Sequence, residues 1–261
     1  MRRLFSALVL LALVGCATSP TSTAPSGDKE LSRNNNLARV AFENGSTANA
    51  IDLYGKALQR ARAMDDATEI GNAAYNLALC HVILGQLDQA SVSLAEAKTA
   101  FKRSGGNPAD VLLLEATIAQ RQGKREQSLS LADQVLSASP DESHRFQVAL
   151  LKGTIACEQG DAARARAALA AEKIRVTNPT LLAAKERLAG NIFLLEKKPV
   201  EAAAAFDRAG ALYQKAKRWR DMALALRRAA EAYRAAGDTE RAEDRLLRAQ
   251  RSLAAQGEKA E

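Results

Sequence analysis

The chain has 261 residues, of which 47% are hydrophobic, 26% are charged and only 4% are aromatic. This apolar content is enough for a folded core, so the composition excludes a wholly disordered protein. Alanine, leucine, arginine and glutamate are abundant, which favours an all-α fold over a large β-sandwich or barrel. With two histidines, three cysteines and one tryptophan, the sequence lacks the residues for a multi-histidine metal site or a disulfide-stapled fold.

The first sixteen residues have the organisation of an export signal. Arg2 and Arg3 precede an uncharged apolar run, 4–14, which is too short to span a bilayer but suits the hydrophobic part of a secretory signal. The run ends in the sequence LVGC, which resembles the lipobox of bacterial lipoproteins. The resemblance implies a signal peptide over 1–15 and a lipid, such as palmitate, on Cys16. The alternative is an ordinary cleaved signal followed by an incidental cysteine.

Ala17 stands directly after this cysteine, where an inner-membrane lipoprotein would have aspartate. The resemblance therefore implies the periplasmic face of the outer membrane, provided that the host has two membranes. The following residues are rich in serine, threonine and proline and have no apolar periodicity. We interpret 16–33 as the lipidated cysteine and a flexible tether, although the segment can equally be filler beside the signal.

Turn-like breaks recur along the rest of the chain between helix-favouring stretches. Five are marked by glycine and one by Lys197, which precedes a proline that can begin a helix. Successive breaks at 45, 85, 123, 160, 197 and 237 are 40, 38, 37, 37 and 40 residues apart. This spacing predicts one helical hairpin per period.

Small residues at fixed offsets from these breaks resemble the signature of the tetratricopeptide repeat. The residues that carry the resemblance are Ala38, Ala50, Tyr54 and Ala57, then Ala78, Ala90 and Ala97, then Ala116 and Ala132, then Gly153 and Ala165, then Gly190, Ala202 and Phe206, and finally Ala230, Tyr233, Ala242 and Ala249. The resemblance implies a right-handed solenoid of about six hairpins over 34–256, followed by a frayed tail, 257–261. Ser128 and Glu172 depart from the pattern, the family's early tryptophan is missing, and a generic helical bundle is the alternative.

We find no catalytic constellation in the sequence. His81 occupies a packing position of its repeat and His144 lies two repeats away, and no phosphate loop or metalloprotease motif occurs. We therefore expect no enzyme activity, no cofactor and no metal. Cys80 and Cys157 lie in first helices of repeats two and four, too far apart for a disulfide, so we expect two thiols.

The mature chain is basic. Without Arg2 and Arg3 it has 35 basic and 30 acidic residues, a net charge of about +5, and much of the excess falls in 215–234. Two interpretations stay open: a solvated helix face, or a patch for anionic lipid, lipopolysaccharide or an acidic partner. Trp219 beside this cluster is either a partner anchor or a core residue. Nucleic acid is not an expected partner outside the cytoplasm.

The family resemblance implies a concave wall, formed by the first helix of each repeat, that binds extended peptides or helices. The positions of this chain that match the wall are Asn35, Arg39, Phe42, Asn72, Tyr75, Leu79, Val82, Leu113, Thr117, Gln120, Thr154, Arg187, Asn191, Arg227, Glu231 and Arg234. The wall is expected to be apolar near repeats two and three and basic near its end, which suits a mixed apolar and acidic segment. Leu79, Val82 and Leu113 can instead be core residues. Asp110 and Leu114 do not supply the cations of a carboxylate clamp.

Together these features predict a membrane-anchored scaffold that binds envelope proteins or peptide segments. Lipoproteins of this design resemble pilotins of type IV pilus secretins and helpers of outer-membrane protein assembly, an analogy of architecture only. The alternative is a ligand- or glycan-binding accessory lipoprotein for transport or cell-wall metabolism.

Overall fold

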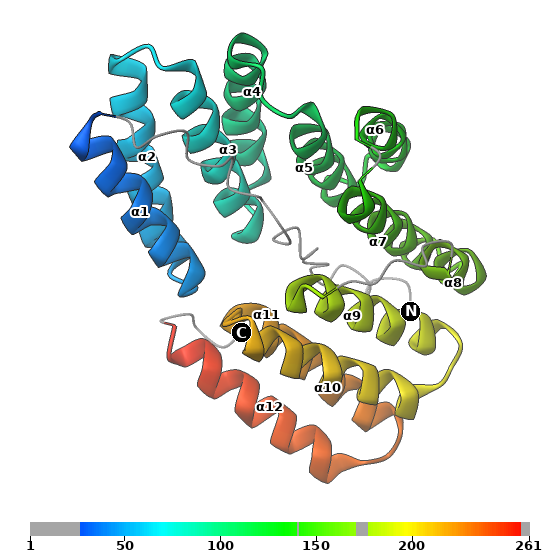
Figure 1. Cartoon of the computed structure of the whole chain (residues 1–261). Coiled ribbons are helices and arrows are strands. Elements are labelled where there is room, and N and C mark those ends of the chain that lie inside the picture. The colour runs from blue at the N-terminus through cyan, green and yellow to red at the C-terminus, as the bar shows by residue number, and fades with distance from the viewer. Residues whose placement is uncertain (1–26, 140, 171–176, 257–261) are drawn as a thin grey trace. The chain divides into compact units, whose positions relative to one another are not determined.

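The computed structural model describes residues 27–139, 141–170 and 177–256. Over these residues the chain forms twelve α-helices and no strands, which confirms the predicted all-α architecture of six helical hairpins (Figure 1). The helices, in chain order, are α1 Lys29–Glu43, α2 Thr47–Ala63, α3 Ala67–Ile83, α4 Leu87–Ser104, α5 Pro108–Arg121, α6 Arg125–Ala138, α7 Glu142–Glu158, α8 Ala162–Ala170, α9 Pro179–Leu195, α10 Pro199–Lys215, α11 Trp219–Ala235 and α12 Thr239–Ala254.

All six hairpin turns share one backbone geometry. In each, the residue after the cap is left-handed, donates its N–H to the carbonyl three residues back, and is followed by a residue that donates to the carbonyl five residues back. This is the Schellman arrangement, which gives partners to carbonyls that the helix end leaves unpaired. The φ values are 80° at Gly45, 76° at Gly85, 77° at Gly123, 78° at Gly160, 59° at Lys197 and 82° at Gly237. The alignment of Lys197 with the glycines, made on spacing alone, is confirmed.

Side-chain caps determine where most first helices begin. Asp28, Asp66, Asn107 and Asn178 each accept a hydrogen bond from a backbone N–H in the first turn of α1, α3, α5 and α9. A proline follows both asparagines at the first helical position, where its fixed φ suits a helix and its missing N–H costs nothing.

Two rows of small residues let the helices of each pair approach closely. One row lies seven residues before each turn and is buried throughout: Ala38, Ala78, Ala116, Gly153, Gly190 and Ala230. The other lies five residues after each turn and is completely buried: Ala50, Ala90, Ser128, Ala165, Ala202 and Ala242. Ser128 fits because its hydroxyl donates to the carbonyl of Ala116 at 2.7 Å, so this departure from the family pattern retains a small, hydrogen-bonded side chain.

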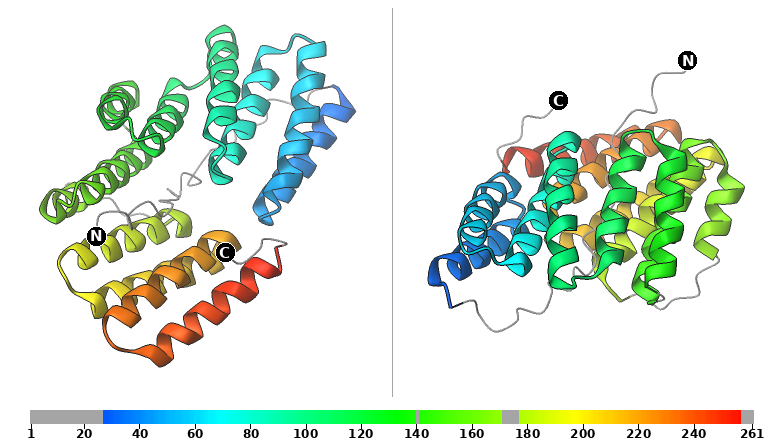
Figure 2. Two further views of the ribbon diagram at one scale, coloured as in Figure 1. Left: turned by 180° about the vertical axis from the view of Figure 1, so that it is seen from behind. Right: turned by 90° about the horizontal axis from the view of Figure 1, so that it is seen from above.

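The chain divides into two compact units, with described residues 27–139 and 141–144 in the first and 145–170 and 177–256 in the second. A core of the first unit gathers Leu31, Leu58 and Ile70 with alanines of α2, α3 and α4. A core of the second unit gathers larger side chains of α7, α9 and α10, including Phe146 and Tyr213. Within the second unit α10 packs against both α9 and α11, and α12 packs on α11, an order that can be followed from behind in Figure 2.

The first helix begins earlier than the sequence indicated. The expected boundary between tether and repeat array lay between residues 33 and 34, but α1 begins at Lys29 and Leu31 is fully buried in the first core. Asp28 accounts for the difference, because it caps α1 through the N–H of Leu31 at 2.8 Å and pairs with Arg60 of α2 at 2.5 Å. The signal peptide, Cys16, Glu172 and the tail 257–261 lie outside the described residues.

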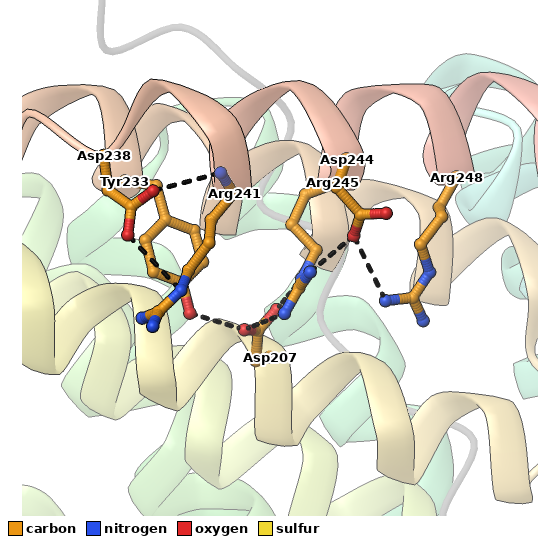
Figure 3. Close-up of polar contacts among 7 residues, drawn as sticks. All are labelled: Asp207, Tyr233, Asp238, Arg241, Asp244, Arg245 and Arg248. Atoms are coloured by element: carbon orange, nitrogen blue, oxygen red, sulfur yellow. Dashed lines mark hydrogen bonds and ion pairs between the residues drawn. The ribbon is translucent and has the colours of Figure 1, made fainter.

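A polar network holds α12 in addition to its apolar contacts with α11 (Figure 3). Asp207 of α10 accepts hydrogen bonds from Tyr233 Oη of α11 at 2.8 Å and from Arg245 Nε and Nη2 of α12 at 2.8 and 3.0 Å. The guanidinium groups of Arg241 and Arg245 both lie 5.7 Å from the centre of the Tyr233 ring. These contacts join α10, α11 and α12 at the end of the second unit.

Candidate partner-binding surface

The candidate residues lie on first helices of the pairs, as the repeat pattern requires. In the first unit they come from α1, α3 and α5, and in the second from α7, α9 and α11. Their burial and contacts differ greatly along the chain.

On α1 the candidate residues form polar contacts with neighbours. Asn35 Nδ2 donates to Glu69 Oε2 of α3 at 3.0 Å, and Arg39 pairs with Glu43 one turn later at 2.7 Å. Burial raises the pKa of Glu69, the negative charge of Asp66 raises it further, and the Asn35 hydrogen bond acts in the opposite direction. Phe42 is half-buried and packs against a core formed by α1, α2 and α3.

Asn72 and Tyr75 on α3 are half-buried and lie three residues apart, on one face of the helix. The Asn72 Oδ1 atom is shielded from solvent and receives no hydrogen bond from the described residues. An unpaired buried amide oxygen costs about 1–3 kcal/mol. Burial raises the pKa of Tyr75 above its ordinary value, and the charge of Asp110 on α5 adds to the effect. This pair combines an unsatisfied acceptor with a partly accessible aromatic ring.

Five candidate residues of repeats two and three are buried, which corrects the expectation of an open apolar wall there. Thr117 is fully buried and its hydroxyl donates to the carbonyl of Leu113 at 2.9 Å, within its own helix. Leu79, Val82 and Leu113 are therefore core residues, which is the alternative that the sequence had left open. The exposed fractions are 4% for Leu79, 1% for Val82, 4% for Leu113, 0% for Thr117 and 3% for Gln120.

In the second unit Thr154 is buried, whereas the candidates of α9 and α11 are half-buried or exposed. Arg228, which the sequence placed only in the basic cluster, joins two candidates. It donates to Asn191 Oδ1 at 3.2 Å, pairs with Glu231 at 2.6 Å and lies 5.4 Å from the centre of the Phe206 ring. The remaining candidates there are Arg187, Arg227 and Arg234.

Part of the basic cluster is neutralised. Arg218 pairs with the buried Asp221 at 2.6 Å, and Arg228 pairs with Glu231. Among the residues that the structure describes, Arg227 and Arg234 form no ion pair, so they retain their charge for solvent or for a partner. Trp219 is half-buried at the first position of α11.

Sequence reasoning missed a cluster around His144. The ring Nε2 atom lies 2.9 Å from Asp110 Oδ1 on α5, and Nδ1 contacts Asp141 Oδ2 just before α7. His144 is buried, and Asp110 also acts on Tyr75. The sequence does show Asp141 three residues before the histidine, a spacing typical of a helix N-cap. It gave no indication of the contact with Asp110, which lies 34 residues away.

A cavity of about 270 Å³ lies between α8 and α9 in the second unit. Its lining is mostly apolar, with Arg166 and Lys185 as its charged members; Arg166 is paired with Glu196 at 2.5 Å. Small-molecule sites usually measure about 300–1,000 Å³, so this cavity is at or below the lower limit.

The other side chains that could take part in chemistry, His81 and the two cysteines, do not form an assembled site. His81 is half-buried and its Nδ1 lies 2.6 Å from Gln86 Oε1. Cys80 and Cys157 are thiols, and burial raises the pKa of Cys157 to about 12, with a smaller contribution from Glu158. Within the described ranges, no group of three or more His, Cys, Asp or Glu side chains could hold a metal ion, and no helix is long and apolar enough to cross a bilayer.

Comparison with known proteins supports the repeat assignment. Residues 31–103, the first two helical pairs, match the model of the tetratricopeptide repeat. No curated protein sequence matches the chain. Among solved structures, BtubC (BKLC) from P. vanneervenii is 19% identical with a TM-score of 0.51, over 90% of this chain and 95% of that one. The C-terminal part of a TPR repeat-containing protein from Cytophaga hutchinsonii is 16% identical with a TM-score of 0.44, over 85% and 80% of the two chains.

At this level of identity the structural likeness to BtubC concerns the fold alone, and it extends along most of the chain. The same turn geometry and the same two rows of small residues recur in all six hairpins, beyond the region that the family model matches. Tetratricopeptide repeats are typical of scaffolds for protein or peptide partners. Residues 31–103 are thus tetratricopeptide repeats, and the remaining hairpins of the chain have the same repeat architecture.

Proposed function

We propose that this protein is a lipid-anchored scaffold of the bacterial envelope that binds segments of other envelope proteins and catalyses no reaction. The observation that carries the binding proposal is the pair formed by Asn72 and Tyr75. The Asn72 side chain is half-buried and its oxygen lacks a donor, so a rotation of the amide towards solvent would let it accept a hydrogen bond from a partner's backbone N–H, while the tyrosine ring supplies contact area. Assembly of a secretin or of outer-membrane proteins is a role in which such a scaffold would act.

The anchoring part of the proposal rests on the sequence around Cys16. The charged start, the apolar run and the LVGC sequence occur together at the spacing of a lipoprotein signal. Several acyl chains on one cysteine would hold the protein firmly, because each buried methylene contributes about 0.8 kcal/mol. Metabolic labelling with a fatty acid tests this part: label is expected on the wild-type protein and not on Cys16→Ala. Equal labelling of both would refute it.

The binding part is tested by photo-crosslinking in living cells. A crosslinker at Tyr75 is expected to capture a defined protein, and a crosslinker at the exposed Gln59 of α2 is the matched control on a second helix. The Tyr75 product should weaken when Asn72 is changed to Ala, because the acceptor is lost. Capture of the same proteins from both positions, or a Tyr75 product unaffected by Asn72→Ala, would refute the proposed surface.

The second candidate function is a ligand- or glycan-binding accessory lipoprotein. The observation in its favour is the cavity between α8 and α9, with Lys185 as a cation at its lining. Its volume is small for a ligand site, so we favour the scaffold. Specific saturable binding of a glycan or metabolite that is abolished by Ile192→Trp would reverse this preference.

A further inference from the structure

His144 lies between two carboxylates from different parts of the first unit. Its Nε2 atom faces Asp110 in the first turn of α5 at 2.9 Å, and its Nδ1 atom faces Asp141, directly before α7. An ionised carboxylate can only accept hydrogen bonds, so both ring nitrogens must donate. Only the imidazolium has two N–H groups. The geometry therefore assigns the charged form to a side chain that is only 8% exposed.

The charged groups that interact with the His144 ring are both carboxylates. Asp110 and Asp141 are the two charged groups that act on it from α5 and from the segment before α7. Tyr75 of α3 is a titratable group that interacts electrostatically with Asp110, and Glu142 and Arg145 flank the histidine on α7 itself. A cation in the first turn of a helix is opposed by the helix dipole, so the two carboxylates are what stabilises it there.

Asp141 holds more than the ring. Its Oδ1 atom accepts the backbone N–H groups of Ser143 at 2.6 Å and His144 at 3.2 Å, and its Oδ2 atom also accepts from Ser139 Oγ at 3.2 Å. The same carboxylate thus caps α7 and binds the imidazolium. Loss of the proton from His144 would leave one ring nitrogen as a lone pair directed at a carboxylate oxygen, which is repulsive.

We propose that His144 is a pH-dependent clasp, which ties the first turn of α7 to the first turn of α5 while it is protonated and releases it when the proton is lost. The chain passes from the first compact unit into the second directly after this residue. The clasp therefore controls how firmly the last residues of the first unit are held.

The raised pKa of His144 determines how the stability of the fold should depend on pH. The hydrogen bond to Asp110 is the main cause that raises the pKa of His144 above its ordinary value of 6.5, and burial opposes it. A raised pKa in the folded state stabilises the fold fully below pH 6.5, and this contribution is lost as the pH rises through the folded-state value. Burial alone would raise the pKa of Asp141, but the hydrogen bonds from His144 bring it below its ordinary value of 3.8, so this carboxylate favours the charged form that the imidazolium needs.

Release also changes the candidate binding surface. Asp110 is shared between His144 and the neighbourhood of Tyr75, so deprotonation leaves its negative charge without the imidazolium beside a residue proposed to contact partners. This consequence depends on the proposed function, whereas the clasp itself does not.

Nitrogen NMR of the full chain tests the clasp directly. The protein has two histidines, so a His81→Gln variant assigns the remaining ring without ambiguity. At pH 6 both nitrogens of His144 are expected at shifts of protonated imidazolium, with a titration midpoint above 6.5. The midpoint should fall in Asp110→Asn, which keeps the shape of the side chain and removes its charge. A titration midpoint at or below 6.5, or a midpoint unchanged in Asp110→Asn, would overturn the proposal.

Denaturation provides the second measurement. The urea midpoints of wild type and His144→Gln should differ more at pH 6 than at pH 9, because the glutamine has no proton to lose. Amide protection of Ser143 and His144, corrected for the intrinsic exchange rate, should fall at pH 9 in the wild type. A difference in midpoint that is the same at both pH values would show a structural contact without pH control, and would overturn the clasp.

Discussion

Arg245 of α12 forms a two-bond ion pair with Asp207 of α10, 38 residues earlier in the chain, with N to O distances of 2.8 and 3.0 Å. Both side chains are about four-fifths buried. The hydrogen bonds with Asp207, together with the negative charge of that carboxylate, raise the pKa of the Arg245 guanidinium, although burial opposes the shift. This contact links the final helix to the helix two positions before it.

Removal of this pair should destabilise the end of the array. Arg245→Met keeps the apolar stem and removes the charge, and we expect a loss of about 1–3 kcal/mol because Asp207 is left partly buried without its main donor. Urea unfolding followed by circular dichroism measures the change. Arg248→Met is the control, since within the described part of the chain Arg248 pairs only with Asp244, at 3.7 Å, and is half exposed. Equal effects of the two substitutions would contradict the assignment.

A methyl group at Gly190 should not fit. A Cβ atom there would lie 2.7 Å from Phe206 Cε1, closer than real side-chain contacts, so Gly190→Ala is expected to cost about 1–3 kcal/mol. Gly55 of α2 is the matched control, because a Cβ atom there has nothing within 4 Å. Gly55→Ala should stabilise the protein by about 0.5–1 kcal/mol through helix propensity. A gain in stability from both substitutions would show that the close approach at Gly190 has no energetic role.

Lys197 carries a left-handed backbone that glycine adopts without cost. Lys197→Gly is therefore expected to raise the free energy of unfolding by about 1 kcal/mol. Lys198, with φ of −112°, is the control, and Lys198→Gly should give no gain. Thermal unfolding compares the three proteins. A stabilisation by glycine at 198 but not at 197 would contradict the shared turn geometry.

The contacts of Asp28 should make the free energy of unfolding fall when the solution becomes strongly acidic. The hydrogen bond from Arg60 is the main cause that lowers the pKa of Asp28 below its ordinary value of 3.8, with the N–H of Leu31 contributing. A lowered folded-state pKa stabilises the fold above pH 3.8, and this contribution is lost as the pH falls through the folded-state value. The difference in urea midpoint between wild type and Asp28→Asn should thus be present at pH 7 and vanish near pH 2. Glu30→Gln, at an exposed position 4.0 Å from Arg60, should show little difference at either pH.

The repeat architecture was predictable because it depends on backbone rules that recur. Glycine at five turns, proline after Asn107 and Asn178, and small residues at fixed offsets are each visible in the sequence, and their agreement identified Lys197 without a glycine. Ser128 shows why a departure was tolerated: a hydroxyl is small enough for the alanine position and finds a carbonyl within reach.

The candidate surface was less predictable because exposure depends on neighbours that are distant in sequence. Leu79 and Thr117 occupy the same position of successive first helices as Arg39, yet they are buried and Arg39 is exposed. The start of α1 was missed for the same reason, since Asp28 is held by Arg60, 32 residues later. Asp110 and His144 likewise meet only in the folded chain.

Trp219 is the single tryptophan of the sequence, and it opens α11 in the second compact unit. Its fluorescence therefore reports on that unit alone, while the far-ultraviolet helix signal averages over both. A denaturation experiment that records the two signals together can show whether the units melt as one cooperative block or in sequence, without any label or added probe.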